Sequence, residues 1–239
     1  MILSFLLVVF ISCVHIFANK ISFLRTLPRN KWLSLAGGIS VAFVFLHILP
    51  ELHHFQDSID DTALLPVSFE NDLYLMAMAG ILLFYGIERG IIRFRSQGTT
   101  QRDQAIDTII YRSHIAVFAL FNLIIGYYLH HEMKVDGLSS LLTFMALGFH
   151  FLINDYSLLR HHKKLYHRTG RWIMTAAVIT GWGIGATYII PETISSLLFA
   201  LVAGAIILNS FKEELPEEKE SNFGFFLIGA TLYSVLWIV

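Results

Sequence analysis

The sequence predicts an all-α membrane protein, an eight-helix transmembrane bundle with both termini outside. Three observations lead to this prediction: the composition, the number of apolar runs and the placement of the basic residues. Of the 239 residues, 55% are hydrophobic and only 15% are charged, whereas soluble domains carry about 25% charged residues. The net charge of −1 gives no case for nucleic-acid binding, and a single cysteine, Cys13, excludes an internal disulfide and a thiolate zinc site.

Eight runs of the chain approach the roughly 20 apolar residues that a helix needs to cross the hydrocarbon core. The first has no basic segment before it and no small-residue cleavage site, so we interpret it as a retained helix rather than a signal peptide. The sixth and seventh are separated only by Ile190-Pro191-Glu192, where the proline suits a first helical turn. One long helix there would reduce the count to seven. We predict a single transmembrane domain over residues 1–239, with spans at about 2–19, 34–54, 71–95, 108–131, 137–159, 169–189, 191–212 and 221–239.

The basic residues set the predicted orientation. Sixteen of the 17 lie in or beside the connections after the first, third, fifth and seventh spans, and the exception is Lys134. Basic connections face the cytosol in membrane proteins, so both termini are expected outside. A seven-span count would place Lys212 on the wrong side of the membrane, which favours eight spans.

Polar side chains gather in the fourth and fifth spans, where lipid offers them no hydrogen-bond partner. The fourth span carries His114 and Asn122, and the fifth carries His150, Asn154 and Asp155. His150 and Asn154 are four residues apart and share a helix face, while Asp155 lies about 100° further round. Imidazole, amide and carboxylate groups one turn apart suit a divalent cation. These five residues are the predicted metal ligands.

Two structural interpretations stay open beside the metal site. Asn122 could join neighbouring helices by a hydrogen bond, with Gly126 allowing the close approach of their backbones. Asp155 could lie near the inner interface and pair with Arg160 or Lys163.

Two motifs resemble those of the ZIP (Zrt-, Irt-like) metal transporters. The run from Gly38 to Glu51 ends in His47-Ile-Leu-Pro50-Glu51 and resembles the second span of that family. The run from Gly204 to Glu217 resembles the end of the family's seventh span, which closes with Glu-x-Leu-Pro. Eight spans, outer termini and an inner third-to-fourth connection are also similar to the family.

The family's transport site is similar to His-Asn-x-Pro-Glu-Gly in the fourth span and His-x-x-Pro-Glu in the fifth. Here Asn122 and Gly126 match the fourth-span motif. In the fifth span His150 is kept, Asn154 stands at the Glu position, and Asp155 follows it, where some members carry their acid. The His, Pro and Glu of the fourth-span motif are replaced by Phe121, Ile124 and Ile125.

The resemblance implies a transporter that moves zinc, iron or manganese towards the cytosol, with zinc the first expected cargo. One weak site would use His150 and Asp155 with an amide oxygen from Asn122 or Asn154. His47 and Glu51 would lie at the outer mouth as an entry or gate. The alternative is a degenerate ZIP-like scaffold without metal transport, acting as a sensor, a partner-binding membrane protein or a carrier of another solute.

We expect no enzyme and no tightly bound cofactor, because the sequence contains no hydrolytic triad, no phosphate-binding loop and no His-Glu-x-x-His pattern. The expected partners are the lipid bilayer and the transported divalent metal, with a homodimer left open. The expected location is a plasma membrane or a bacterial inner membrane.

Overall fold

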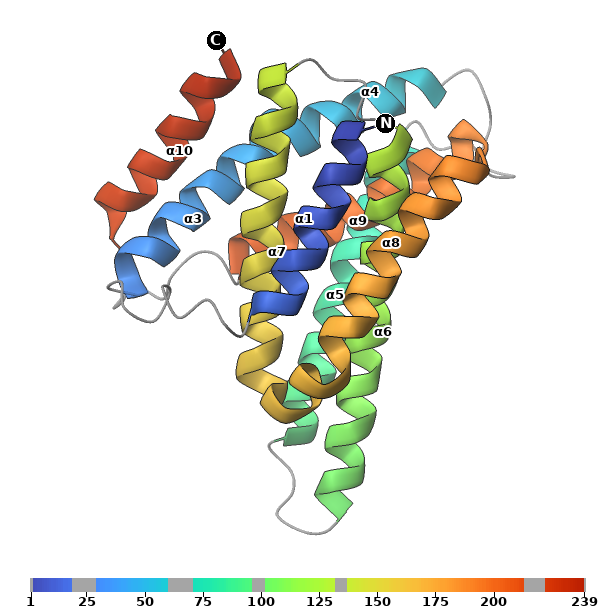
Figure 1. Cartoon of the computed structure of the whole chain (residues 1–239), viewed down its shortest axis with the longest axis vertical. Coiled ribbons are helices and arrows are strands. Elements are labelled where there is room, and N and C mark those ends of the chain that lie inside the picture. The colour runs from blue at the N-terminus through green and yellow to red at the C-terminus, as the bar shows by residue number, and fades with distance from the viewer. Residues whose placement is uncertain are drawn as a thin grey trace.

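The structure, a computed structural model, describes residues 2–18, 29–59, 71–95, 102–131, 137–212 and 222–238. These residues form helices and short connections without any strand (Figure 1). Each predicted span coincides with one helical segment, when α3, η2 and α4 are taken together, so the all-α prediction is confirmed. The segments are α1 (Ile2–Phe17), α3 (Arg29–Phe43), the π-helix η2 (Val44–Ile48), α4 (Leu49–Ile59), α5 (Asp72–Arg95), α6 (Arg102–His131), α7 (Gly137–Leu165), the π-helix η3 (Tyr166–Gly170), α8 (Arg171–Thr187), α9 (Glu192–Lys212) and α10 (Phe223–Ile238).

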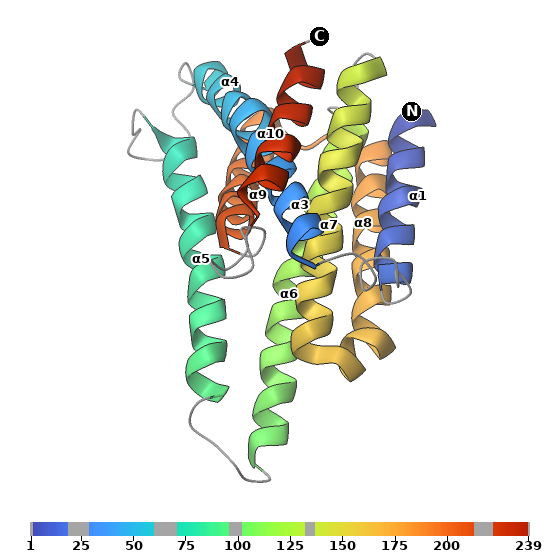
Figure 2. The ribbon, with the colours of Figure 1, turned by 90° about the vertical axis from the view of Figure 1, so that its left-hand side faces the viewer.

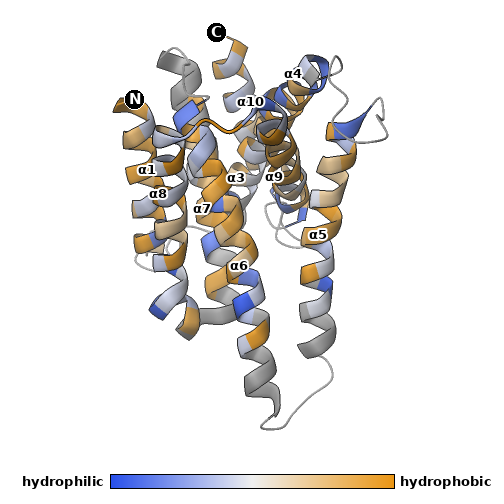
Figure 3. Cartoon of the chain, turned by 90° about the vertical axis from the view of Figure 1, so that its right-hand side faces the viewer, coloured by the Kyte–Doolittle hydropathy of each residue, from blue (hydrophilic) through white to orange (hydrophobic). Residues whose placement is uncertain are grey.

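Several helices have the length and apolar character of membrane spans. Among the described residues, three stretches are long and apolar enough to cross a membrane: Ser34–Ser58, Tyr111–His131 and Glu192–Lys212. Large apolar side chains remain exposed along α1, α5 and α10, and Figure 3 shows hydrophobic residues along the lengths of the helices. Both ends of the chain lie at the same end of the bundle (Figures 1 and 2).

The proline between the predicted sixth and seventh spans separates two helices. α8 ends at Thr187, Tyr188 is extended, and α9 begins at Glu192 directly after Pro191. The Pro191 carbonyl accepts a hydrogen bond of 3.0 Å from the Ser195 N–H, so it caps the first turn of α9. The Ile190 N–H donates to the Tyr127 hydroxyl on α6, which fixes the connection against the bundle.

A second proline, Pro50, accompanies a change of helix type in the predicted second span. Proline lacks an N–H and clashes with the carbonyl one turn earlier. The chain widens into η2 just before it, where the Leu49 N–H donates to the Val44 carbonyl five residues back. A π turn of this kind re-aims the helix that follows. The predicted second span is therefore three consecutive helical pieces.

Three helix pairs cross at reciprocal glycines: α6 with α8, α3 with α10, and α5 with α9. A Cβ added at Gly181 on α8 would lie 1.9 Å from the Leu123 carbonyl oxygen, and one at Gly126 on α6 would lie 2.2 Å from that of Val178. Only glycine lets the two backbones approach so closely. The packing role considered for Gly126 is therefore confirmed. The other reciprocal glycines are Gly38 with Gly229 and Gly80 with Gly204.

These pairs belong to two groups of helices. α1, α6 and α8 pack mainly on one another, with α7 against α1, and α3, η2, α4, α5, α9 and α10 pack mainly on one another (Figure 2). α7 also packs on α3 and α10, so it lies between the two groups. His15, Asn122 and Asp155 meet within the first group, and Asn154 meets Asn209 where α7 faces α9 of the second group.

Candidate functional site

The imidazole of His15 links three helices at the polar centre of the bundle. Its Nδ1 lies 2.8 Å from Oδ2 and 3.0 Å from Oδ1 of Asp155 on α7. Its Nε2 lies 2.9 Å from Oδ1 of Asn122 on α6. All three side chains are at most 2% exposed. A charged or amide group buried so fully is stable only when it is hydrogen-bonded, and His15 supplies the bond to both neighbours.

The surrounding contacts decide which atoms face the His15 ring. The Asn122 amide nitrogen donates to the Phe118 carbonyl at 2.8 Å and to the Met174 sulfur at 3.4 Å, so its oxygen is left to accept from His15. The Tyr166 hydroxyl donates to Asp155. Each ring nitrogen of His15 therefore faces a side-chain oxygen, Nδ1 that of Asp155 and Nε2 that of Asn122. The His15–Asp155 pair is a buried contact between an imidazole and a carboxyl group.

Two residues near the start of α8 add to the electrostatics of this centre. Burial, together with the Asp155 charge, raises the pKa of Tyr166 well above its usual value, so its hydroxyl stays protonated as a donor. The Arg171 guanidinium donates to the Ile16 carbonyl at 3.4 Å, next to His15. The alternative pairing of Asp155 with Arg160 or Lys163 concerns side chains outside the described residues.

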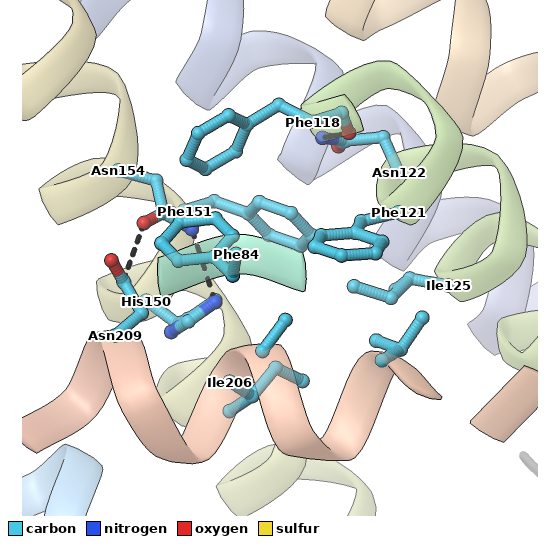
Figure 4. Close-up of a pocket in the computed structure, with 12 residues that line it drawn as sticks. Phe84, Phe118, Phe121, Asn122, Ile125, His150, Phe151, Asn154, Ile206 and Asn209 are labelled. Atoms are coloured by element: carbon cyan, nitrogen blue, oxygen red, sulfur yellow. Dashed lines mark hydrogen bonds between the residues drawn. The ribbon is translucent and has the colours of Figure 1, made fainter. Parts of the chain in front are cut away.

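A second group of polar side chains joins α7 to α9. The Asn154 amide nitrogen donates to Nε2 of His150 at 3.0 Å, one turn earlier on the same helix. The Asn209 amide nitrogen donates to Oδ1 of Asn154 at 2.5 Å. Figure 4 shows both bonds along one edge of a small pocket. This chain of bonds crosses between the two groups of helices.

The pocket holds about 20 Å³ of free space, which is room for about one water molecule. In Figure 4 the phenylalanine rings of the lining lie between Asn122 on one side and His150, Asn154 and Asn209 on the other. The Phe121 ring stacks on that of Phe84 in this lining. The lining residues are Phe84, Phe118, Phe121, Asn122, Ile125, His150, Phe151, Asn154, Val202, Ala205, Ile206 and Asn209.

The five predicted metal ligands fall into two neighbouring clusters and one outlying residue. Asn122 and Asp155 are joined through His15, and His150 is bonded to Asn154. His114 is buried two turns before Asn122, with its ring centroid 5.9 Å from that of Phe118. Within the described part of the chain, no group of three or more His, Cys, Asp or Glu side chains is arranged to hold a metal ion.

The two predicted gate residues lie elsewhere, on the helical segments η2 and α4. The His47 ring stacks on Phe43 at 5.1 Å and meets Trp237 of α10 edge-on at 5.2 Å. Glu51 is half-buried in the first turn of α4. Both belong to the helix group that does not contain Asp155.

His15, Tyr166 and Asn209 belong to the site but were not among the residues predicted from the sequence. The sequence could have indicated His15 and Asn209, because each is a polar residue inside an otherwise apolar run and such residues are often functional. Tyr166 lies beyond the predicted fifth span, and no spacing links it to Asp155. Its contact arises because the chain turns through η3 before α8 begins.

No match to this chain is found among models of protein families, curated proteins or solved structures. The fold and the site define its class: the described residues are helical, three stretches of them are long and apolar enough to cross a membrane, and they enclose a buried, hydrogen-bonded polar centre. Any closer assignment depends on the residues of the chain itself.

Proposed function

We propose that this chain is a ZIP-like membrane carrier that moves a divalent cation, namely zinc, iron or manganese, towards the cytosol. The observation that carries the proposal is the Asp155 carboxylate, which is 1% exposed inside an apolar helical bundle. An ionisable group at such a depth is costly and is by default functional. The motif at His47-Ile-Leu-Pro50-Glu51 and the Glu-x-Leu-Pro motif that ends at Pro216 support the family.

In this proposal the eight helical segments cross the membrane as one domain, with both termini outside. The position of the basic residues supports this orientation, as does the position of both chain ends at one end of the bundle (Figure 2). The cation would move down its gradient, and the chain would catalyse no reaction. The membrane would be a plasma membrane or a bacterial inner membrane, and a homodimer is compatible with the proposal.

Asp155 would supply the only charge in the transport site. Oxygen ligands would come from the amides of Asn122 and Asn154, and His150 would add an imidazole at the pocket. A single carboxylate gives a weak site, which suits a carrier because the cation must also leave. His114 would lie along the path two turns from Asn122.

Uptake into proteoliposomes tests the proposal. Purified protein should carry zinc, iron(II) or manganese(II) into the lumen, as read by a metal-sensitive dye inside the vesicles. Asp155→Ala and His150→Ala should abolish the uptake, because they remove the charge and the imidazole. His167→Ala, at an exposed histidine on η3, is the matched control and should transport normally. Uptake that persists unchanged in both site variants would disprove the proposal.

A second candidate function is a ZIP-like scaffold that moves no metal and acts as a sensor, a partner-binding protein or a carrier of another solute. The hydrogen bonds of the polar residues favour it. Asn122 is bonded to α1 through His15, and Asn154 to α9 through Asn209, as expected of residues that join helices. This candidate predicts wild-type protein with neither bound metal by elemental analysis nor metal uptake.

A further inference from the structure

The His15 ring fills the space between the two oxygens closest to it, those of Asp155 and Asn122. A divalent cation such as zinc lies about 2.0–2.2 Å from each ligand oxygen. Two oxygens that share one such cation are therefore at most about 4.4 Å apart. Here each oxygen instead contacts a different nitrogen of the imidazole, at 2.8 Å and 2.9 Å, so the whole ring separates them.

The neighbours of the ring hold it in this position. Phe151 meets it edge-on, with ring centroids 5.2 Å apart, and His15 is only 1% exposed. The other hydrogen-bonding atoms of Asn122 and Asp155 are already engaged by Phe118, Met174 and Tyr166. The Asp155 and Asn122 oxygens thus point at the His15 ring. The ring, which comes from α1, is the polar partner of both oxygens, and a bound cation would take the same role.

We infer that His15 is an internal occupant of the proposed cation site. Its imidazole closes the site between α1, α6 and α7, and a divalent cation binds Asp155 only when the ring has left. This inference rests on the proposed function, because the ligand set is that of the proposed carrier. His15 lies on α1, a helix that supplies no ligand in the sequence-based prediction. Through His15, α1 would control the access of a cation to Asp155.

Removal of the ring should convert a closed site into a cation-binding site. In His15→Ala, Asp155 is left buried without its imidazole partner, and space opens beside it. Divalent zinc or manganese should then raise the melting temperature of the purified full chain in detergent, followed by the fluorescence of its four tryptophans. At a concentration about 100 times the Kd, the expected rise is about 5–10 °C. Wild-type protein should show a much smaller rise at the same concentration.

The matched control is His15→Ala combined with Asp155→Asn, which keeps the opened space but removes the charge. It should lose the cation-dependent rise. If His15→Ala does not fold, the same melting measurement is made on His15→Asn, and the same cation-dependent rise is expected. The asparagine side chain is shorter than the imidazole, so it can still bond Asp155 but leaves space next to the Asn122 oxygen. A folded single variant without a cation-dependent rise, or a double variant with an equal rise, overturns the inference.

The outcomes separate this inference from the proposed function. Metal uptake by the wild type, together with no cation effect in His15→Ala, contradicts the inference and leaves the carrier in place. No uptake by the wild type, together with a clear cation effect in His15→Ala, contradicts the carrier and supports His15 as the occupant of the site.

Discussion

Asn209 on α9 donates a hydrogen bond of 2.5 Å to Oδ1 of Asn154 on α7, and both side chains are at most 5% exposed. This bond connects the two groups of helices beside the pocket. Asn154 passes the connection on to His150 through its amide nitrogen. One amide thus holds the imidazole of α7 in place while it also binds α9.

The Asn154–Asn209 bond should contribute measurably to stability. In a double-mutant cycle of Asn154→Ala and Asn209→Ala, we expect a coupling free energy of about 0.6–1.7 kcal/mol, the range of hydrogen bonds between membrane helices. The measurement is reversible unfolding in mixed detergent micelles. Fully additive single variants would show that the two amides do not interact.

Removal of the Tyr166 hydroxyl should destabilise the protein, because the hydroxyl donates to Asp155. We expect Tyr166→Phe to lower the free energy of unfolding by about 1.5–3 kcal/mol, as for hydrogen bonds to charged groups. Tyr233→Phe is the control, since the Tyr233 hydroxyl is buried with no hydrogen-bond partner among the described residues. That variant should be as stable as the wild type or slightly more stable. Equal losses in both variants would argue against the Asp155 contact.

The glycine crossing of α6 with α8 can be tested within a single helix. Gly181→Ala places a Cβ 1.9 Å from the Leu123 carbonyl oxygen, and the forced separation of the helices should cost about 1–3 kcal/mol. Gly183→Ala is the matched control, because its Cβ meets no atom of the described chain within 4 Å. It should stabilise the helix by up to about 1 kcal/mol. Melting temperatures in detergent should therefore move in opposite directions.

The proposed topology predicts which loop positions an external reagent can reach. In a Cys13→Ser background, Ser68→Cys lies in an outer connection and Gln97→Cys in an inner one. A membrane-impermeant maleimide added to intact cells should label Ser68→Cys alone. Labelling of both should require permeabilised cells. The reverse pattern would invert the orientation, and labelling of both in intact cells would contradict the span count.

The helices were predictable from the sequence because an apolar run of about 20 residues is typical of a membrane-spanning helix. The break at Pro191 was also predictable, since proline ends a helix or begins one. The π turn before Pro50 was not predictable. The proline shows that the helix must change its hydrogen bonding there, but it does not show which type of turn results. Close packing was predicted at Gly126 without its partner helix, and the other two glycine crossings were not predicted. A glycine in an apolar run does not reveal which helix packs against it.

At the polar centre, the sequence pointed to the importance of Asp155, Asn122 and His150, because buried polar groups in apolar helices are costly. It could not pair them. Asp155 and its His15 partner are 140 residues apart, and the ion-pair partners that the sequence suggested for Asp155 were the nearby Arg160 and Lys163.

The sequence by itself determined that the chain is helical and apolar enough for a membrane, and where its apolar runs lie, although several helices extend past the predicted spans. Those properties follow from local composition and from the hydrogen bonds that each helix satisfies internally. Only the tertiary structure decided that an imidazole from α1 lies between Asn122 and Asp155. The partner of a buried polar group is set by which helices pack together, and that packing depends on close approach at glycines far apart in the chain.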